Sequence, residues 1–220
     1  IFFYNHLAAI DDNQLANGHS FSIDSHFISS KILHPKYNDG GQRIVRTSRN
    51  TEFWRYNYYE NLDYIFVHTP ESDKLDESEE EKKLRKQKLF EEAQKVFNQK
   101  QPIVIAPEGT SETEDNKTIT SPGPFKAGAF NLAFKLSPKP KLIPIALANF
   151  DYPVSKTIYS AVIKEPITIS DHVKDPENQE EMKSFLDNYR TKFRSYVEEA
   201  IDLAKNCLLY TSPSPRDTRR

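Results

Sequence analysis

The 220-residue chain carries 30 Lys and Arg against 32 Asp and Glu, which gives a formal net charge of −2. It has no clustered basic excess of the kind that marks a nucleic-acid-binding protein, and no apolar run approaches the ~18 residues of a membrane span. The only cysteine is Cys207, so an internal disulfide and a cysteine-based metal site are excluded.

The two ends of the chain shape the expected domain boundaries. Ile1 opens the chain within an apolar run, and Cys207 to Asp217 match one reading frame of a transposase sequencing adapter. A genuine Pro/Ser-rich tail is the alternative. We expect an N-terminally truncated domain over 1–206 and a non-native tail over 207–220. Because the tail carries three arginines and one aspartate, the preceding part has a net charge nearer −4.

Apolar spacing and turn signals predict alternating strands and helices. In the first part of the chain, we expect a strand over 1–4, a helix beginning within 7–16, a strand over 26–29, and a turn or short helix over 31–37. We then expect a strand over 43–46, a helix over 51–61, a strand over 64–67, and a helix over 76–99. The last part should form a strand over 103–106, a helix over 125–136, strands over 142–147 and 158–163, and a helix over 177–206. This alternation predicts an α/β fold with a largely parallel central sheet flanked by helices.

A histidine and an aspartate follow the first expected strand with the spacing H-x-x-x-x-D. If His6 ends the strand and Asp11 lies in the first turn of the next helix, the carboxylate can fold back to the imidazole. A carboxylate in that place fixes one tautomer and leaves the other ring nitrogen as a general base. Because such spacing is common, a surface histidine near a helix cap is the alternative.

Two further polar groups follow expected elements. Glu108, Gly109 and Thr110 come directly after the apolar strand at 103–106, which places them at the sheet edge where ligands bind. Lys126 lies where a helix begins, and free main-chain N–H groups beside a lysine suit a phosphate. The alternatives are an ordinary turn and a solvent-facing lysine.

Together these blocks resemble the phospholipid/glycerol acyltransferase family. The matching blocks are Asn5-His6…Asp11, Pro107 to Thr110, Pro124 to Phe130, and Ile143-Pro144-Ile145. The resemblance implies an O-acyltransferase that moves an acyl group from acyl-CoA or acyl-carrier protein, as co-substrate, to a glycerolipid hydroxyl, most often that of lysophosphatidic acid. It makes His6 the base, Asp11 its orienter, and Glu108, Gly109 and Thr110 the acceptor-binding residues, with no other cofactor.

The sequence departs from the family pattern at two arginines that hold the acceptor phosphate. The segment 63–69 has no arginine, and Ser111 stands where one commonly follows the PEGT block. Lys126, Lys31, Arg46 or Arg49 are the available substitutes. The departures leave a non-catalytic lipid-binding scaffold, or an acyltransferase for another lipid acceptor, as alternatives.

The sequence gives little support to a metal site or a serine hydrolase. A metal site from His6, His19, Asp24 and His26 fits no known ligand spacing, so we expect none. The absence of G-x-S-x-G argues against a serine hydrolase. Family resemblance implies a membrane surface as partner, on its cytoplasmic face, reached through the missing N-terminus or through an exposed apolar patch near Phe125 and Phe130.

Overall fold

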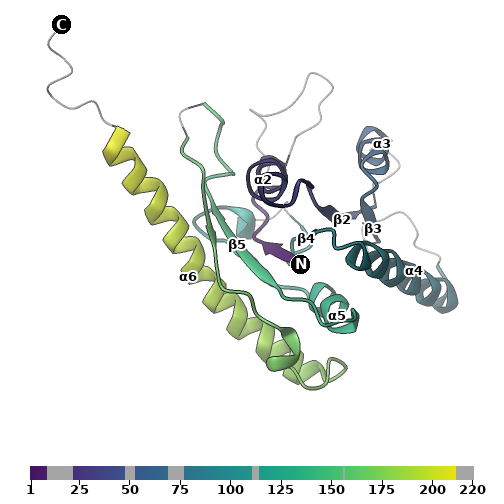
Figure 1. Cartoon of the computed structure of the whole chain (residues 1–220). Helices are drawn as coiled ribbons and strands as arrows, with labels where there is room; N and C mark the ends of the chain where they lie inside the picture. Colours follow the sequence, from purple (N-terminus) through teal and green to yellow (C-terminus); the bar gives the residue numbers. More distant parts are fainter. Residues whose placement is uncertain (9–21, 48–52, 69–76, 111–113, 156, 212–220) are drawn as a thin grey trace, which may run out of the picture.

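The computed structural model describes residues 1–8, 22–47, 53–68, 77–110, 114–155 and 157–211. Its centre is a six-stranded sheet in the order β3-β2-β4-β1-β5-β6. The strands are β1 (Phe2–Tyr4), β2 (Gln42–Arg46), β3 (Ile65–Val67), β4 (Ile103–Ile105), β5 (Ile143–Ala148) and β6 (Ser160–Ile163). The first five run parallel, and β6 pairs antiparallel with β5. The predicted α/β fold with a largely parallel sheet is therefore confirmed (Figure 1).

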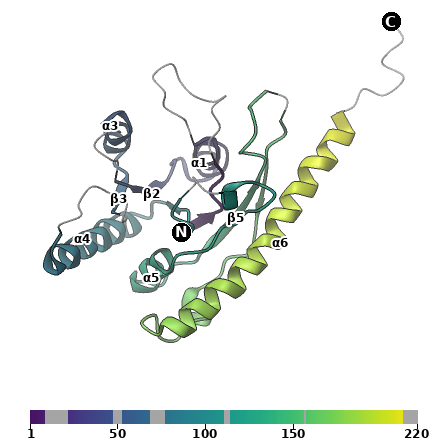
Figure 2. The ribbon, with the colours of Figure 1, turned by 180° about the vertical axis from the view of Figure 1, so that it is seen from behind.

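Helices cover both faces of this sheet. They are α1 (Ile23–Phe27), the π-helix η2 (Ile28–Leu33), α2 (His34–Tyr37), α3 (Phe53–Asn61), α4 (Glu79–Asn98), the 3-10 helices η3 (Glu114–Asn116) and η4 (Ile169–Asp171), α5 (Ala127–Lys135) and α6 (Gln179–Thr211). Figures 1 and 2 show α4 and α5 on the opposite side of the sheet from α2 and α3.

Alternation along the buried strands separates two cores. Phe2 and Tyr4 of β1 face one side, where they pack with Ile28 and Leu33 of η2. Phe3, between them in sequence, faces the other side. Because successive strand residues point to opposite faces, one short apolar strand contributes to both cores. Side chains of the central strand β1 are therefore packed on both faces of the sheet.

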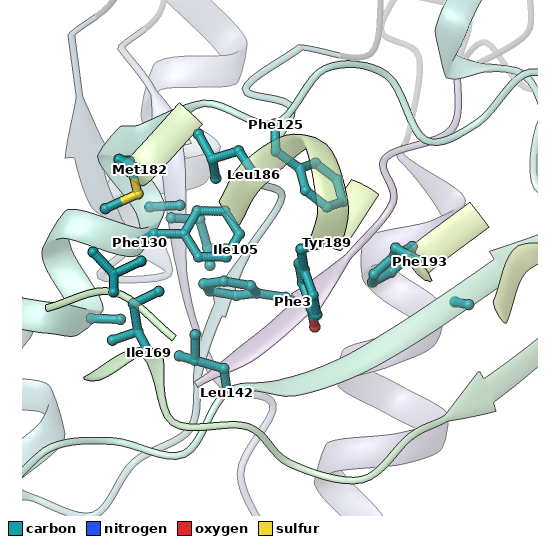
Figure 3. Close-up of a cluster of buried hydrophobic side chains, with 14 of the residues drawn as sticks. Phe3, Ile105, Phe125, Phe130, Leu142, Ile169, Met182, Leu186, Tyr189 and Phe193 are labelled. Atoms are coloured by element: carbon teal, nitrogen blue, oxygen red, sulfur yellow. The ribbon is translucent and has the colours of Figure 1, made fainter. Parts of the chain in front are cut away.

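The larger core joins β1 to α5 and α6 through aromatic rings (Figure 3). Phe130 of α5 is fully buried and lies edge-on to Phe3 at 4.9 Å between ring centroids, with Phe125 and Tyr189 also beside it. Phe125 is 8% exposed and Phe130 is 0% exposed. The expected exposed apolar patch near these two residues is therefore wrong, because both rings fill the core beneath α6.

One strand prediction fails as well. Residues 26–29 were expected to form a strand, but they lie in the continuous helical segment made by α1 and η2. Ile28 and Leu33 are fully buried against the sheet. Their five-residue separation suits the wider turn of a π-helix, so tertiary packing overrides the β-type composition of this stretch.

At the C-terminal end, α6 continues through Thr211. The predicted domain end at Asn206 thus falls within a helix, and the boundary stays a prediction. In the described part of the chain, none of the helices has the length and apolar character needed to cross a membrane.

Candidate active site

The site begins two residues beyond β1, where His6 leaves the sheet at its carboxyl edge. His6 Nδ1 lies 2.6 Å from Asp24 Oδ2, in the first turn of α1. The imidazole side chain is 20% exposed, whereas Asp24 is 1% exposed. The site therefore has a buried carboxylate behind a histidine that still reaches solvent.

Asp24 is held by several donors besides the imidazole. Its Oδ2 accepts the main-chain N–H of Leu7 at 2.9 Å, and its Oδ1 accepts Ser22 Oγ–H at 2.9 Å and the N–H of Ser25 at 2.5 Å. These bonds satisfy the buried carboxylate and fix its direction toward His6. The carboxylate is therefore rigid before any substrate arrives.

Opposing electrostatic effects set the protonation of this pair. Burial lowers the pKa of His6, but the charge and hydrogen bond of Asp24 outweigh it, so the pKa of His6 is raised above its ordinary value. Burial raises the pKa of Asp24, but His6 and the N–H of Leu7 outweigh burial and leave it below its ordinary value. Asp24 thus stays ionised and strengthens His6 as a base.

The residue predicted to orient His6 was Asp11, which lies outside the described residues. The structure brings Asp24 to His6 from 18 positions along the chain, and the role of Asp11 stays a prediction. The sequence pattern pointed to Asp24 only as one of four residues, His6, His19, Asp24 and His26, whose spacing fits no known metal site. Among the described residues, no group of three or more His, Cys, Asp and Glu side chains is placed to hold a metal ion.

Glu108 follows β4, the neighbour of β1, and reaches the main chain of His6. Its Oε1 accepts the His6 N–H at 2.9 Å, and its Oε2 accepts the Gly123 N–H at 2.9 Å and Asn116 Nδ2 at 2.8 Å. Glu108 is 2% exposed. It therefore ties three segments of the site together, and its predicted contact with the acceptor stays a prediction.

The pKa of Glu108 reflects a balance between burial and these donors. Burial raises it to about 7, against the opposing effect of the Gly123 and His6 N–H groups and the charge of His6. A carboxyl group with such a pKa changes charge near neutrality. The main-chain support of His6 is therefore sensitive to pH.

Lys126 lies over the glycine of the same loop. Gly109 has a φ of +70°, and a Cβ at this position would lie 3.2 Å from Lys126 Nζ. The N–H of Lys126 donates to Pro107 O at 2.8 Å, which fastens the start of α5 to the loop after β4. Lys126 is exposed. The structure thus brings together His6, Glu108, Gly109 and Lys126. Thr110 lies in the same site, because its carbonyl oxygen accepts Asn116 Nδ2 at 2.9 Å.

A buried arginine contacts Ser25, the residue after Asp24, and was not predicted as part of the site. Arg43 of β2 is 5% exposed and donates to Ser25 Oγ at 2.8 Å and to Ser25 O at 2.6 Å. Its guanidinium also lies over the ring of Tyr64 at 5.2 Å. Its positive charge acts to lower the pKa of His6. Arg43 thus anchors the residue next to Asp24 and counteracts the effect of Asp24 on the base.

The proposed substitutes for the missing arginines lie in different places. Lys31 is exposed on η2, Arg46 is half-buried at the end of β2, and Arg49 lies outside the described residues. Lys126 is the one of these four that the described contacts place in the same loop system as Glu108 and Gly109.

A parallel α/β sheet with a buried His–carboxylate pair at its carboxyl edge is an arrangement that is able to support general-base chemistry. Residues 15–148 match the family model described as Acyltransferase. The chain belongs to this family, the phospholipid/glycerol acyltransferases, and is an O-acyltransferase-type enzyme acting with an acyl donor and a lipid acceptor. The match contains Asp24, Glu108 and Lys126 and begins after His6 and Asp11. A search among curated proteins found no match.

Proposed function

We propose that the enzyme transfers a fatty acyl group from acyl-CoA or acyl-carrier protein to the hydroxyl of lysophosphatidic acid, with His6 as general base. The observation that carries this proposal is the 2.6 Å contact of His6 Nδ1 with the buried Asp24 carboxylate. It supports a neutral imidazole with its proton on Nδ1 and a lone pair on Nε2. Nε2 is then available to an acceptor hydroxyl.

The transfer needs no covalent enzyme intermediate. Nε2 of His6 takes the hydroxyl proton while the acceptor oxygen attacks the thioester carbonyl carbon. The resulting tetrahedral intermediate expels the thiolate, which receives that proton from His6, so an ester and a free thiol are formed. Asp24 stays ionised and stabilises the imidazolium between the two proton transfers.

Lys126 supports a phosphate-bearing acceptor. The Lys126 ammonium group lies beside Gly109, and Lys126 is the N-cap residue of α5. A helix N-terminus attracts anions, and a lysine adds a full positive charge. A phosphate held there would lie on the same loop as Glu108, whose carboxylate accepts the His6 N–H.

The test measures thiol release from acyl-CoA in the presence and absence of lysophosphatidic acid. We expect acceptor-dependent release by the wild-type enzyme, and release at the background rate by His6→Ala. Turnover retained by His6→Ala would overturn the mechanism. Turnover with another lysolipid but not with lysophosphatidic acid would overturn the acceptor assignment, and lipid binding without any turnover would favour the scaffold alternative.

Ser22 provides a control for direct transfer. Ser22 Oγ lies 3.5 Å from His6 Nε2, which superficially resembles a Ser–His–Asp triad, but its hydroxyl donates to Asp24 Oδ1. We expect Ser22→Ala to lose less than about tenfold in kcat/KM, since it removes one of several donors to Asp24 rather than a nucleophile. A loss as large as that of His6→Ala, with an acyl-enzyme detected by mass spectrometry, would contradict direct transfer.

We also propose that the enzyme works at the cytoplasmic face of a membrane, because both acyl chains partition into bilayers and CoA is a cytoplasmic co-substrate. Two loops at the site edge carry exposed apolar side chains: Ile119 is 67% exposed, Tyr152 43% and Val154 59%. The Thr118 N–H donates to Asp151 Oδ2 at 3.1 Å and joins these loops. They form a rim suited to contact a lipid surface.

Flotation with phosphatidic acid-containing vesicles tests this rim. We expect the double variant Ile119→Ser/Val154→Ser to float less than the wild-type protein. Ile163→Ser, which changes a residue 53% exposed on β6 away from the rim, is the matched control and should float normally. Equal flotation of all three proteins would refute a role for the rim.

A further inference from the structure

Asn116 contacts both the main chain of His6 and the carboxylate of Glu108, which accepts the His6 N–H. Asn116 closes η3, in the segment that joins the Glu108 loop to α5, and it is fully buried. Its Nδ2 lies 2.8 Å from His6 O, 2.8 Å from Glu108 Oε2 and 2.9 Å from Thr110 O. One amide group thus serves three acceptors at the centre of the site.

This contact matters because His6 lies beyond the end of β1. The strand ends at Tyr4, so the main chain at residues 6–8 is held by contacts outside the strand. The His6 N–H donates to Glu108 Oε1, the His6 carbonyl accepts Asn116 Nδ2, and the Ala8 N–H donates to Asn116 O at 2.7 Å. Asn116 therefore holds this segment through both its side chain and its main chain.

We propose that Asn116 is a positioning residue that keeps His6 in register for catalysis by bridging its carbonyl group to Glu108. The proposal rests on the function proposed for His6. Asn116 would act through His6 and Glu108 rather than by touching the substrate.

The amide suits this place because it donates without carrying charge. Its NH₂ group supplies two hydrogens, and the His6, Glu108 and Thr110 oxygens beside it are acceptors. An aspartate of the same shape would present a carboxylate oxygen to the Glu108 carboxylate at about the present 2.8 Å contact. Two carboxylates so close cannot both ionise without strong repulsion, so they would share a proton.

The sharpest test is therefore the pH profile of Asn116→Asp. The charged groups that act on His6 are Asp24 from α1, Glu108 after β4 and Arg43 from β2, and their sum raises the pKa of His6. Wild-type kcat/KM should rise with pH as His6 loses its proton. In Asn116→Asp, rising pH also ionises the new acid pair and displaces the main chain of His6. The ratio of variant to wild-type activity should fall as pH rises.

We expect a loss of roughly 10²-fold in kcat at pH 8, the size of effect produced by a small misplacement of a catalytic group, and a smaller loss at pH 6. KM for acyl-CoA should change little, because Asn116 is buried. Asn98→Asp makes the same chemical change at an exposed residue at the end of α4 and should keep the wild-type profile. A constant activity ratio across pH would overturn the proposal.

A second variant covers a failure of Asn116→Asp to fold. Asn116→Ser keeps one donor and adds no charge, so kcat should fall with KM unchanged. Wild-type kcat in folded Asn116→Ser would equally overturn the proposal. The His6→Ala assay separates the two hypotheses: turnover by His6→Ala removes the proposed function, whereas turnover that needs His6 but not Asn116 removes only the positioning role.

Discussion

Replacing Asp24 with asparagine is expected to lower kcat/KM for acyl transfer by about 10²–10⁴. The buried carboxylate accepts from His6 Nδ1 at 2.6 Å and holds the Nδ1–H tautomer. An asparagine can direct its NH₂ group at Nδ1, which favours the opposite tautomer and protonates Nε2, the nitrogen that must act as base. Thiol release with saturating acyl-CoA and varied lysophosphatidic acid measures the loss.

The pH profile gives this prediction a second readout. The charge and hydrogen bond of Asp24 are the largest effects that raise the pKa of His6 against burial, so without them the pKa of His6 should fall. The rise of the remaining kcat/KM with pH should therefore move to lower pH in Asp24→Asn. A profile with its midpoint unchanged would show that Asp24 does not act on the base.

Asp11→Asn is the matched control, because the H-x-x-x-x-D spacing predicts Asp11 as the partner of His6. Since Asp24 occupies Nδ1, we expect Asp11→Asn to keep kcat/KM near the wild-type value. The reverse outcome, with a large loss in Asp11→Asn and a small one in Asp24→Asn, would restore the sequence-based pairing and contradict the assignment of Asp24.

The central strands β1, β4 and β5 were predictable because they are short, apolar and almost entirely buried. Ile103–Ile105 and Ile143–Ala148 appear in the structure almost where apolar runs and flanking prolines placed them. The helix over 76–99 is likewise α4, Glu79–Asn98, which begins with a capping box between Ser78 and Glu81. Local composition determines such elements. Local composition did not determine the secondary structure of residues 26–29, where packing of Ile28 and Leu33 onto the sheet imposes a helix.

The site was predicted in part, to the extent that it depends on strand ends. His6 and Glu108 follow adjacent parallel strands, so topology alone brings them together, as the 2.9 Å bond between His6 N–H and Glu108 shows. Asp24 and Asn116 reach His6 from 18 and 110 positions away. No spacing rule encodes these contacts. The first-turn position of Asp24 in α1 could not serve as a signal, because the sequence predicted a strand over 26–29 where the structure has a helix.

Replacing Phe130 with alanine should cost about 3–5 kcal/mol of the free energy of unfolding, the usual range for removing a buried phenylalanine. Phe130 is fully buried, and its ring meets Phe3, Phe125 and Tyr189 (Figure 3). It also meets the ring of Phe185. Alanine leaves a cavity that rings from three separate elements cannot fill together. Denaturant unfolding should show a lower midpoint with an unchanged slope.

This core also positions the site, so activity should fall with stability. Phe3 lies three residues before His6 on β1, and Phe125 lies directly before Lys126. Loosening the contact between these rings frees both segments at once. Leu84→Ala, at a residue 67% exposed on α4, is the control and should change the free energy of unfolding by no more than about 0.5 kcal/mol. If Phe130→Ala unfolds like the control protein, the aromatic cluster does not hold α5 and α6 against β1.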